Sequence, residues 1–346
     1  MSFVRKISNR ILSALDFGPR SVIALMADKG PDGSLRILGG GECPARGMRS
    51  GAITHLGDAV ECAVEASRKA QKAAGAGMGA VYFNFKDAAM EIRRPVGHKS
   101  LSGEGQIRAS DVAQTCAIAE RSVGRFDRFI AYSSQTGFLI DDRDAVANPV
   151  GVFGRKLEAS LIVFLARSEA VEGWRKLIRR SGFQKGVPVL SAWSTALGVL
   201  PPEDRRGRKL ILDLGEDFFS FFVFDDNRVV DYRGTAPGAG GGVFPHGAAK
   251  VLREFLGANA PADPVLVTGD LAEDEKTVRA LGVLLPQPPR VVSPGLSGLA
   301  HPRFSSAAGL LSAADELETK ARMTHPRRGL IGRVRRKAEA FISEYF

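Results

Sequence analysis

Two short segments of the chain repeat one pattern, in which an apolar run enters an Asp-x-Gly corner and a second apolar run leaves it. The first passes through Asp16 and Gly18, and the second, in the other half of the chain, passes through Asp213 and Gly215. Apolar, β-rich runs on either side of a tight corner are typical of a β-hairpin. One such corner is weak evidence, because Asp and Gly are common in any turn. The pair predicts a duplicated α/β fold with two similar halves.

Paired hairpins of this kind resemble those of the actin, Hsp70 and sugar-kinase ATPases. The resemblance implies a duplicated, ribonuclease H-like (actin-like) ATPase fold, in which the two hairpin tips face each other across a cleft. Backbone N–H groups would hold the phosphates of ATP there, and Asp16 and Asp213 would hold a hydrated Mg²⁺. The candidate nucleotide-binding residues are Asp16, Gly18, Arg20, Ser21, Asp213, Gly215, Gly240, Gly241 and Gly269.

Length and composition agree with a two-lobed protein. The chain has 346 residues, of which 44% are hydrophobic, so it can bury a substantial core. Its three cysteines, Cys43, Cys62 and Cys116, lack metal-ligand spacing and follow no signal peptide, which leads us to expect a reducing cytoplasm. No apolar run approaches the roughly 20 residues that span a bilayer, so we expect no transmembrane segment.

The formal net charge of +10 is concentrated near one end of the chain. Residues 320–346 contain eight Lys or Arg against two acidic residues, and this segment alone accounts for +6. The rest of the chain is only mildly basic. The charge therefore characterises a terminal segment and does not predict a nucleic-acid-binding face on the fold.

The same terminal segment is amphipathic if residues 330–346 form a helix. Apolar and aromatic side chains then share one arc, and most basic side chains lie opposite. Such a helix suits the surface of an anionic membrane, and the alternative is a last helix packed on the core. The candidate membrane-binding residues are Leu330, Ile331, Arg333, Val334, Arg335, Arg336, Lys337, Phe341, Ile342, Tyr345 and Phe346. A nucleic-acid tail is disfavoured, because phosphate binding has no use for so regular an apolar face.

Three longer stretches carry a more specific resemblance. The segments Ile37–Ile53, Asn148–Phe164 and Val189–Leu200 each resemble segments of FtsA, the bacterial actin-like cell-division protein, and Val265–Leu271 is similar to the strand and turn that meet the adenosine. FtsA also ends in a basic amphipathic membrane helix. The resemblance therefore implies an actin-like fold with an inserted FtsA-type 1C domain, which serves self-association and contacts to division partners.

The resemblance divides the chain into six parts. They are residues 1–87 and 167–207 as lobe 1A, residues 88–166 as the inserted 1C domain, residues 208–318 as lobe 2A, residues 319–329 as a linker and residues 330–346 as the membrane helix. Within the insert we expect a helix at Ala109–Ser122 and strands at Phe129–Ser133, Gly137–Asp141 and Leu157–Leu165.

The candidate cleft departs from the FtsA pattern. Glu216 and Asp217 replace two glycines after the second corner, where carboxylates repel phosphate and side chains block close backbone approach. Pro19 removes an N–H donor from the first turn. Two roles for Arg20 stay open, a contact to phosphate and a solvated turn residue. Leu197 stands where the family usually carries an acid. These motifs are degenerate for an ATPase, so we expect ATP to bind weakly or not at all.

A second departure concerns size. Between Arg233 and Val265 there is room for one glycine-rich loop and one helix, whereas FtsA inserts here the 2B domain that meets FtsZ. The leading hypothesis is a membrane-tethered scaffold of the division machinery that links division proteins, with FtsZ as one candidate, to the cytoplasmic face of the cell membrane at the division site. An active actin-like ATPase and an actin-like adaptor of a pilus or secretion assembly are the alternatives.

Overall fold

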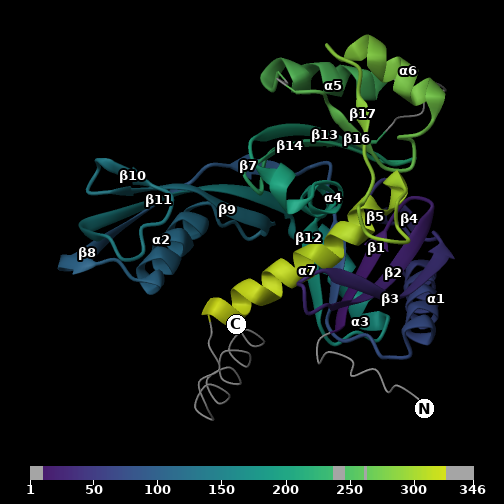
Figure 1. Ribbon diagram of the computed structural model, residues 1–346, viewed down its shortest axis with the longest axis horizontal. Coiled ribbons are helices and arrows are strands. Elements are labelled where there is room, and N and C mark those ends of the chain that lie inside the picture. The colour runs from purple at the N-terminus through teal and green to yellow at the C-terminus, as the bar shows by residue number, and fades with distance from the viewer. Residues whose placement is uncertain (1–10, 237–245, 261–262, 325–346) are drawn as a thin grey trace.

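The computed structural model describes residues 11–236, 246–260 and 263–324, and Figure 1 shows two lobes and an elongated inserted domain. The sheet of lobe 1A has the strand order β12-β6-β1-β2-β3, and the sheet of lobe 2A has the order β17-β16-β13-β14-β15. The strands of lobe 1A are β1 (Ile11–Phe17), β2 (Ser21–Lys29), β3 (Leu35–Pro44), β6 (Val81–Phe85) and β12 (Gly186–Leu190). Those of lobe 2A are β13 (Arg208–Leu214), β14 (Phe219–Asp225), β15 (Arg228–Thr235), β16 (Leu266–Thr268) and β17 (Arg290–Val291).

The two lobes repeat one arrangement of strands. In each lobe, the two strands of the hairpin and the strand that follows them are antiparallel neighbours. Two later strands extend the sheet on the other side of the hairpin's first strand, and both run parallel to that strand. Both Asp-x-Gly corners lie at the turn of such a hairpin. The duplicated, actin-like fold class predicted from the sequence is confirmed.

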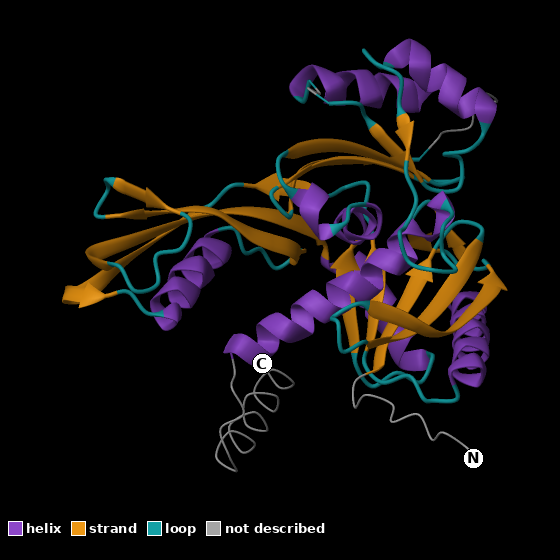
Figure 2. Ribbon diagram, viewed as in Figure 1, coloured by secondary structure: helices purple, strands orange, loops and turns teal. Residues whose placement is uncertain are grey.

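Helices follow the strands at equivalent places in the two lobes. The helices are α1 (Leu56–Ala74), α3 (Ser168–Arg180) and α4 (Ser191–Val199) in lobe 1A, and α5 (His246–Ala258), α6 (Glu275–Leu284) and α7 (Ser305–Thr324) in the second half. Figure 2 shows α5 and α6 on the outer face of the lobe 2A sheet, with α4 and α7 between the lobes. Shorter elements are β4 (Met48–Arg49), β5 (Ala52–Ile53) and two 3₁₀ turns, Pro202–Arg205 and Pro302–Phe304.

Burial on both faces explains the continuous apolar runs of the second hairpin. Successive side chains of a strand point to opposite faces. Phe219 and Phe221 of β14 pack into the core under α5 and α6, whereas Phe222 and Phe224 pack into the core shared with α4 and α7. A sheet covered on both sides needs apolar residues at every position, as parallel sheets do.

Helix α7 crosses α4 at very short range and then runs along lobe 1A. A Cβ atom at Gly309 would lie 1.6 Å from the carbonyl oxygen of Ser194, so only glycine allows this crossing. Beyond it, α7 contacts β1, β2 and β6. Residues 305–318, which the predicted division assigns to lobe 2A, therefore pack against the sheet of lobe 1A.

The inserted domain is a sheet with one helix on it. It comprises β7 (Glu91–Arg93), β8 (Val96–Gln106), α2 (Ala109–Ser122), β9 (Arg128–Ile140), β10 (Asp144–Val146) and β11 (Phe153–Arg167). The sequence predicted two separate strands, at 129–133 and 137–141. This prediction is wrong, because both segments belong to one strand, β9, whose register against β11 shifts at two β-bulges. The polar residues 133–136 interrupt the apolar pattern, and one bulge falls at Thr136, but β9 pairs with β11 on both sides of it.

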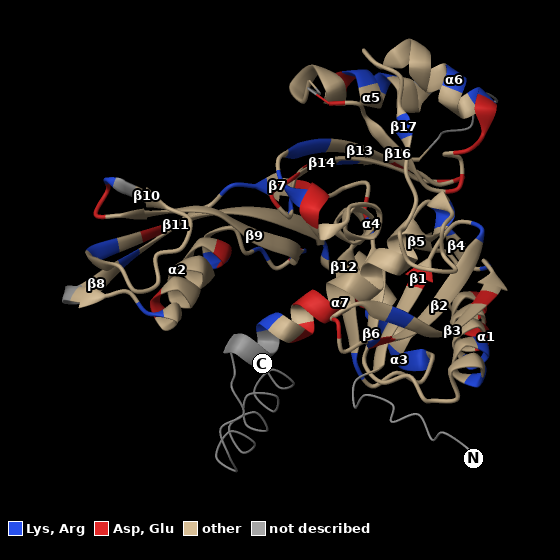
Figure 3. Cartoon of the chain, viewed as in Figure 1, with Lys and Arg blue, Asp and Glu red and all other residues tan. Residues whose placement is uncertain are grey.

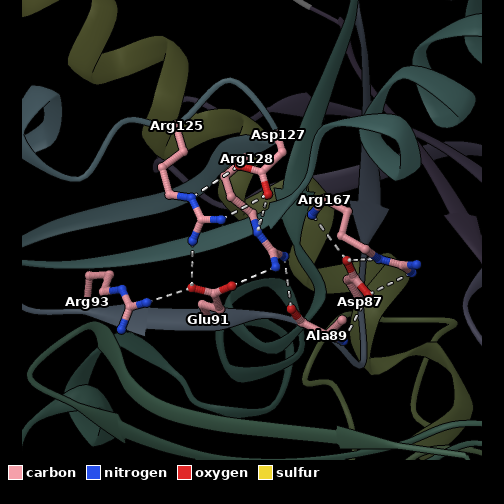
Figure 4. A network of polar contacts seen from close by, with 8 residues as sticks. All are labelled: Asp87, Ala89, Glu91, Arg93, Arg125, Asp127, Arg128 and Arg167. Atoms are coloured by element: carbon pink, nitrogen blue, oxygen red, sulfur yellow. Dashed lines mark hydrogen bonds and ion pairs between the residues drawn. The ribbon is translucent and has the colours of Figure 1, made fainter.

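A network of ion pairs joins the insert to lobe 1A (Figure 4). Asp87, which is buried, accepts hydrogen bonds from the Arg167 guanidinium at 3.2 and 3.3 Å and from the backbone N–H of Ala89 at 2.9 Å. Burial opposes the charged form, yet these donors outweigh it and lower the pKa of Asp87. Close by, Glu91 pairs with Arg128 at 2.6 Å. Both chain crossings into the insert are thereby tied to buried or half-buried charges.

Among the described residues, no helix is both long and apolar enough to cross a membrane. The expected membrane-binding residues of 330–346 lie outside the described part of the chain.

Candidate nucleotide cleft

The two hairpin turns meet at one small cavity between the lobes. Seven of the nine candidate nucleotide-binding residues line it, namely Asp16, Gly18, Arg20, Ser21, Asp213, Gly215 and Gly269. The other two, Gly240 and Gly241, lie outside the described residues. The structure thus brings together residues that are far apart in sequence.

The turns themselves are tight and touch each other. In the first, the Gly18 N–H donates to the Ser21 carbonyl oxygen at 3.0 Å, and in the second, the Gly215 N–H donates to the Phe218 carbonyl oxygen at 3.2 Å. A Cβ atom at Gly215 would lie 3.3 Å from Cγ of Pro19 in the opposite turn. The proline that removes a donor from the first turn therefore also fills the space in front of the second.

The acidic residues that replace glycines after the second corner form bonds across the cleft. Glu216 Oε1 accepts from Nε of Arg20 at 2.6 Å, and Asp217 Oδ2 accepts from the backbone N–H of Ser50, between β4 and β5, at 2.6 Å. Arg20 is thus an ion-pair partner of Glu216, a role that neither interpretation of the sequence anticipated. The protein's own carboxylates occupy donors that face the mouth of the cleft.

The cavity that remains is about 40 Å³. Pockets for nucleotide-sized ligands are on the order of 300–1,000 Å³, so the cleft in this conformation has room for water but not for ATP. The Phe218 ring fills part of the space, with Nζ of Lys86 5.2 Å from its centroid. Residues on both sides must move apart before a nucleotide can enter.

Three carboxyl groups line this cavity, of which Asp16 is buried and Asp213 and Asp270 are half-buried. Burial raises the pKa of Asp16 to about 6, with a hydrogen bond from Ser306 and the charge of Lys86 acting in the opposite direction. Burial likewise raises the pKa of Asp213, and it raises that of Asp270 to about 6, with the neighbouring acids adding to the effect. These groups are held close together with little water, which favours their neutral forms.

The residues present fit a cation better than they fit a triphosphate. Oδ1 of Asp16 is buried and has no hydrogen-bond partner among the described residues, whereas Oδ2 of Asp213 accepts from Thr195 at 3.1 Å. Carboxylate oxygens of this kind are ligands that Mg²⁺ accepts together with water. No group of three or more His, Cys, Asp or Glu in the described part of the chain is arranged to hold a metal ion by itself. A triphosphate would need free backbone N–H groups at the two turns. These turns instead carry Pro19, which has no N–H, and the carboxylates of Glu216 and Asp217, which repel phosphate.

Other positions show why sequence reasoning found only part of the cleft. Leu197 is buried in the core between the lobes and offers no polar group to the cavity. Gly269 has a φ of +98°, and a Cβ there would lie 2.7 Å from Oδ1 of Asp213, so its place in the cavity wall requires glycine. Lys86, Phe218 and Ser306 also line the cavity and were not predicted. Each belongs to a different strand end or helix, and no local motif marks it.

A larger cavity lies on the other side of α4. It measures about 550 Å³ and is formed by β9 of the insert, β12, the turn between β14 and β15, and α7. From Arg128 to Gly137 no described strand pairs with the outer edge of β9, because β10 joins it only at Phe138–Ile140. Trp193, Tyr132 and Arg228 contribute large side chains to the walls. At this edge the Gln135 carbonyl oxygen accepts a hydrogen bond from the Arg228 guanidinium at 2.8 Å.

Comparisons with known proteins identify relatives of the sequence. A family model described as "SHS2 domain inserted in FTSA" matches residues 88–165. The cell division protein FtsA of Escherichia coli K12 is 22% identical over 237 residues, which is 67% of this chain and 56% of that protein. FtsA of Neisseria meningitidis serogroup B is 25% identical over 256 residues, or 72% and 59% of the two chains. The chain thus spans little more than half the length of these relatives.

Solved structures share the fold at low sequence identity. A chain of the PilM–PilN type IV pilus biogenesis complex has a TM-score of 0.60 at 13% identity, and the match covers 88% of this chain and 98% of that one. The ethanolamine utilization protein EutJ from Carboxydothermus hydrogenoformans has a TM-score of 0.50 at 12% identity, with 89% and 93% covered. These matches confirm the predicted fold, and the sequence matches confirm the predicted resemblance.

Proposed function

We propose that this chain, FtsA-like in sequence and actin-like in fold, is a membrane-tethered scaffold of the bacterial cell-division machinery. It links division proteins to the cytoplasmic face of the cell membrane at the division site, and it associates with itself through its actin-like and 1C surfaces. The sequence matches to FtsA of Escherichia coli and Neisseria meningitidis support the division role. No enzymatic activity is part of the proposal.

The bridged cleft is the observation that favours a scaffold over an ATPase. Arg20–Glu216 and Ser50–Asp217 connect the two lobes next to a cavity of about 40 Å³, to whose wall Arg20 belongs. In a nucleotide-driven actin homologue, the phosphates and their cation make this connection. Here the protein's own side chains do so, which supports a scaffold in which ATP and Mg²⁺ bind weakly or not at all.

Titration with ATP tests this part of the proposal. We expect calorimetry with Mg-ATP on the natural protein to give binding weaker than about 100 μM, equivalent to roughly −5.5 kcal/mol. Tight Mg-ATP binding that the substitution Asp16→Ala abolishes would instead make the ATPase the leading hypothesis.

The membrane half of the proposal rests on the sequence of residues 330–346. Phe341 and Ile342 contribute on the order of 2 kcal/mol each when they enter the headgroup region, and each Lys or Arg near an anionic surface adds about 1 kcal/mol. Deletion of 330–346, or the pair Phe341→Glu and Ile342→Glu, should release the protein from anionic vesicles in a co-sedimentation assay. Ser343→Glu, which adds a negative charge on the polar face, is the matched control and should release far less. Unchanged binding after the deletion would reject the tether.

The contact with FtsZ is the least constrained part of the proposal. Between β15 and β16 the described residues form one helix, α5, in the place where FtsA carries the 2B domain. A direct FtsZ contact would have to use another surface. Pulldown of FtsZ by the purified protein, with and without vesicles, decides whether FtsZ is a direct partner.

A second candidate is an adaptor of a pilus or secretion assembly. The structural match to a chain of the PilM–PilN complex covers 98% of that chain, so nearly the whole of its fold has a counterpart here. The cavity of about 550 Å³ beside the outer edge of β9 supports a peptide-binding adaptor as well. Depletion of the protein followed by microscopy separates the two functions, since filamentous cells indicate a division role and normal division with loss of pili indicates an adaptor.

A further inference from the structure

The end of lobe 1A opposite the cleft is strongly basic, for a topological reason. Helix α1 precedes β6 and α3 precedes β12, and β6 and β12 are parallel neighbours in one sheet. Both helices run back against the strand direction and contact each other, so their C-terminal ends lie at the end of the sheet where β6 and β12 begin. Figure 3 shows blue side-chain positions on α1 and α3 at this end.

Exposed cations gather there on two helices and one loop. Arg175 pairs with Glu172 and Lys69 pairs with Glu65, which leaves those charges largely neutralised. Six other cations form no ion pair with any described residue, and we call them the basic end. They are Arg68, Lys72, Lys176, Arg179, Arg180 and Lys185. A cation in the last turn of a helix interacts favourably with the helix dipole. This effect alone does not explain a cluster of six cations.

Helix α7 runs along the face of the lobe 1A sheet opposite to α1 and α3. At its start, Ser305 lies within 2.6 Å of the Thr268 hydroxyl beside the cleft. Farther along, Asp315 pairs with Lys29, at the end of β2 that lies away from the Asp16 turn. In Figure 1 the C-terminal end of α7 and helix α3 lie toward the same side of the molecule. The C-terminal end of α7 is nevertheless separate from the basic end, because Glu316, Leu317 and Lys320 line the cavity beside β9 of the insert.

We propose that the basic end of lobe 1A binds the anionic headgroups of a lipid bilayer, as a second membrane contact beside the terminal helix. The inference rests on the proposed membrane tether, because the C-terminal end of α7 and the basic end face the same side of the molecule, so one bilayer surface can meet both. Lys and Arg near an anionic leaflet are attracted across about one Debye length. With two contacts, the lobe has a fixed orientation, with its cleft facing away from the lipid.

The test uses the full-length protein and vesicles of phosphatidylglycerol mixed with phosphatidylcholine. One variant combines Lys176→Gln, Arg179→Gln, Arg180→Gln and Lys185→Gln. The control removes the same number of exposed cations from the far lobe, with Lys250→Gln, Arg253→Gln, Lys276→Gln and Arg279→Gln on α5 and α6. The basic-end variant should bind anionic vesicles about tenfold or more weakly at low salt and show a smaller salt dependence, while the control stays close to the natural protein.

The arms of the experiment separate the two membrane proposals. If the deletion of 330–346 releases the protein but the basic-end variant binds as the control does, the tether stands and the second contact is wrong. If the deletion releases nothing and the basic-end variant releases the protein, the second contact stands and the terminal helix is wrong. If the basic-end variant loses affinity for an RNA or DNA oligonucleotide while its vesicle binding is unchanged, the surface belongs to nucleic acid and the lipid proposal is overturned.

Discussion

Three carboxyl groups meet at the bottom of the cleft, where the two hairpin turns touch. Asp16 is buried, and Asp213 and Asp270 are half-buried beside it. Loss of water around these groups raises their pKa values, so their charged forms are costly at neutral pH. The residues that most resemble an ATPase are therefore also a source of instability at neutral pH.

The raised pKa values of these carboxyl groups predict how the free energy of unfolding changes with pH. Burial raises the folded-state pKa of Asp16 and Asp270 to about 6, against an ordinary value of 3.8. Between about pH 6 and pH 4 the folded protein binds more protons than the unfolded chain, so the free energy of unfolding should increase as the pH falls through this window. Urea unfolding at pH 7 and pH 5, in EDTA, measures it. Asp16→Asn should stabilise the protein at pH 7 by about 2 kcal/mol and reduce the pH dependence, whereas exposed Asp204→Asn should do neither.

A second prediction concerns the acids that bridge the cleft. Replacing Glu216 and Asp217 by Gly removes both bridges and restores close backbone approach, so affinity for ATP should increase about tenfold, or roughly 1.4 kcal/mol. Asp225→Gly with Asp226→Gly, at the other end of the same hairpin, is the matched control for charge and flexibility. Equal ATP affinity in the two variants would show that the bridges do not limit binding.

At the scale of elements, the crossing of α4 and α7 fixes how the two lobes meet. Gly198 and Gly309 lie at the contact, and a Cβ at either position would come within 2.0 Å of a carbonyl oxygen on the other helix. Gly309→Ala must push the helices apart and should lower the free energy of unfolding by about 2–3 kcal/mol. Gly282→Ala in α6, where a Cβ meets nothing within 4 Å, should instead be neutral or stabilise by up to about 1 kcal/mol. Chemical denaturation of both variants checks this, and equal stabilities would contradict the close crossing.

Sequence patterns predicted elements well where an apolar period was clear. Both hairpins were predicted at their observed Asp-x-Gly corners and α2 at its observed bounds, because their apolar residues repeat at strand or helix spacing. Helix α7 was not predicted as an element, since alanines at Ala307, Ala308, Ala313 and Ala314 are buried on several sides and leave no single apolar stripe. The ion pair between Arg20 and Glu216 could not be predicted either, because it depends on how two distant turns face each other.

At the scale of the whole molecule, the insert is joined to lobe 1A by apolar packing of Ile162, Phe164 and Ala166 and by the contacts of one buried carboxylate, Asp87. Asp87→Ala leaves the Arg167 side chain and two backbone N–H groups without their acceptor, and should lower the free energy of unfolding by about 2–3 kcal/mol. It should also speed protease cleavage at the two crossings near residues 88 and 167. Glu169→Ala removes only an exposed partner of Arg167 at 3.5 Å and should change neither. Protection from protease that is equal in both variants would mean that packing alone fixes the insert.

Helix α7 also has a mechanical consequence. It is a rod of 20 residues, about 30 Å long, that starts beside the cleft and ends where the chain leaves the fold. Its close crossing with α4 lies near the starting end and can serve as a pivot. From Gly309 to Thr324 the helix extends about 22 Å, so a rotation of about 10° at the crossing would displace the far end by about 4 Å. A partner or ligand that separates the two hairpin turns would therefore also rotate α7 about its crossing with α4. The C-terminal end of the helix, where the terminal segment begins, would move farther than the turns do.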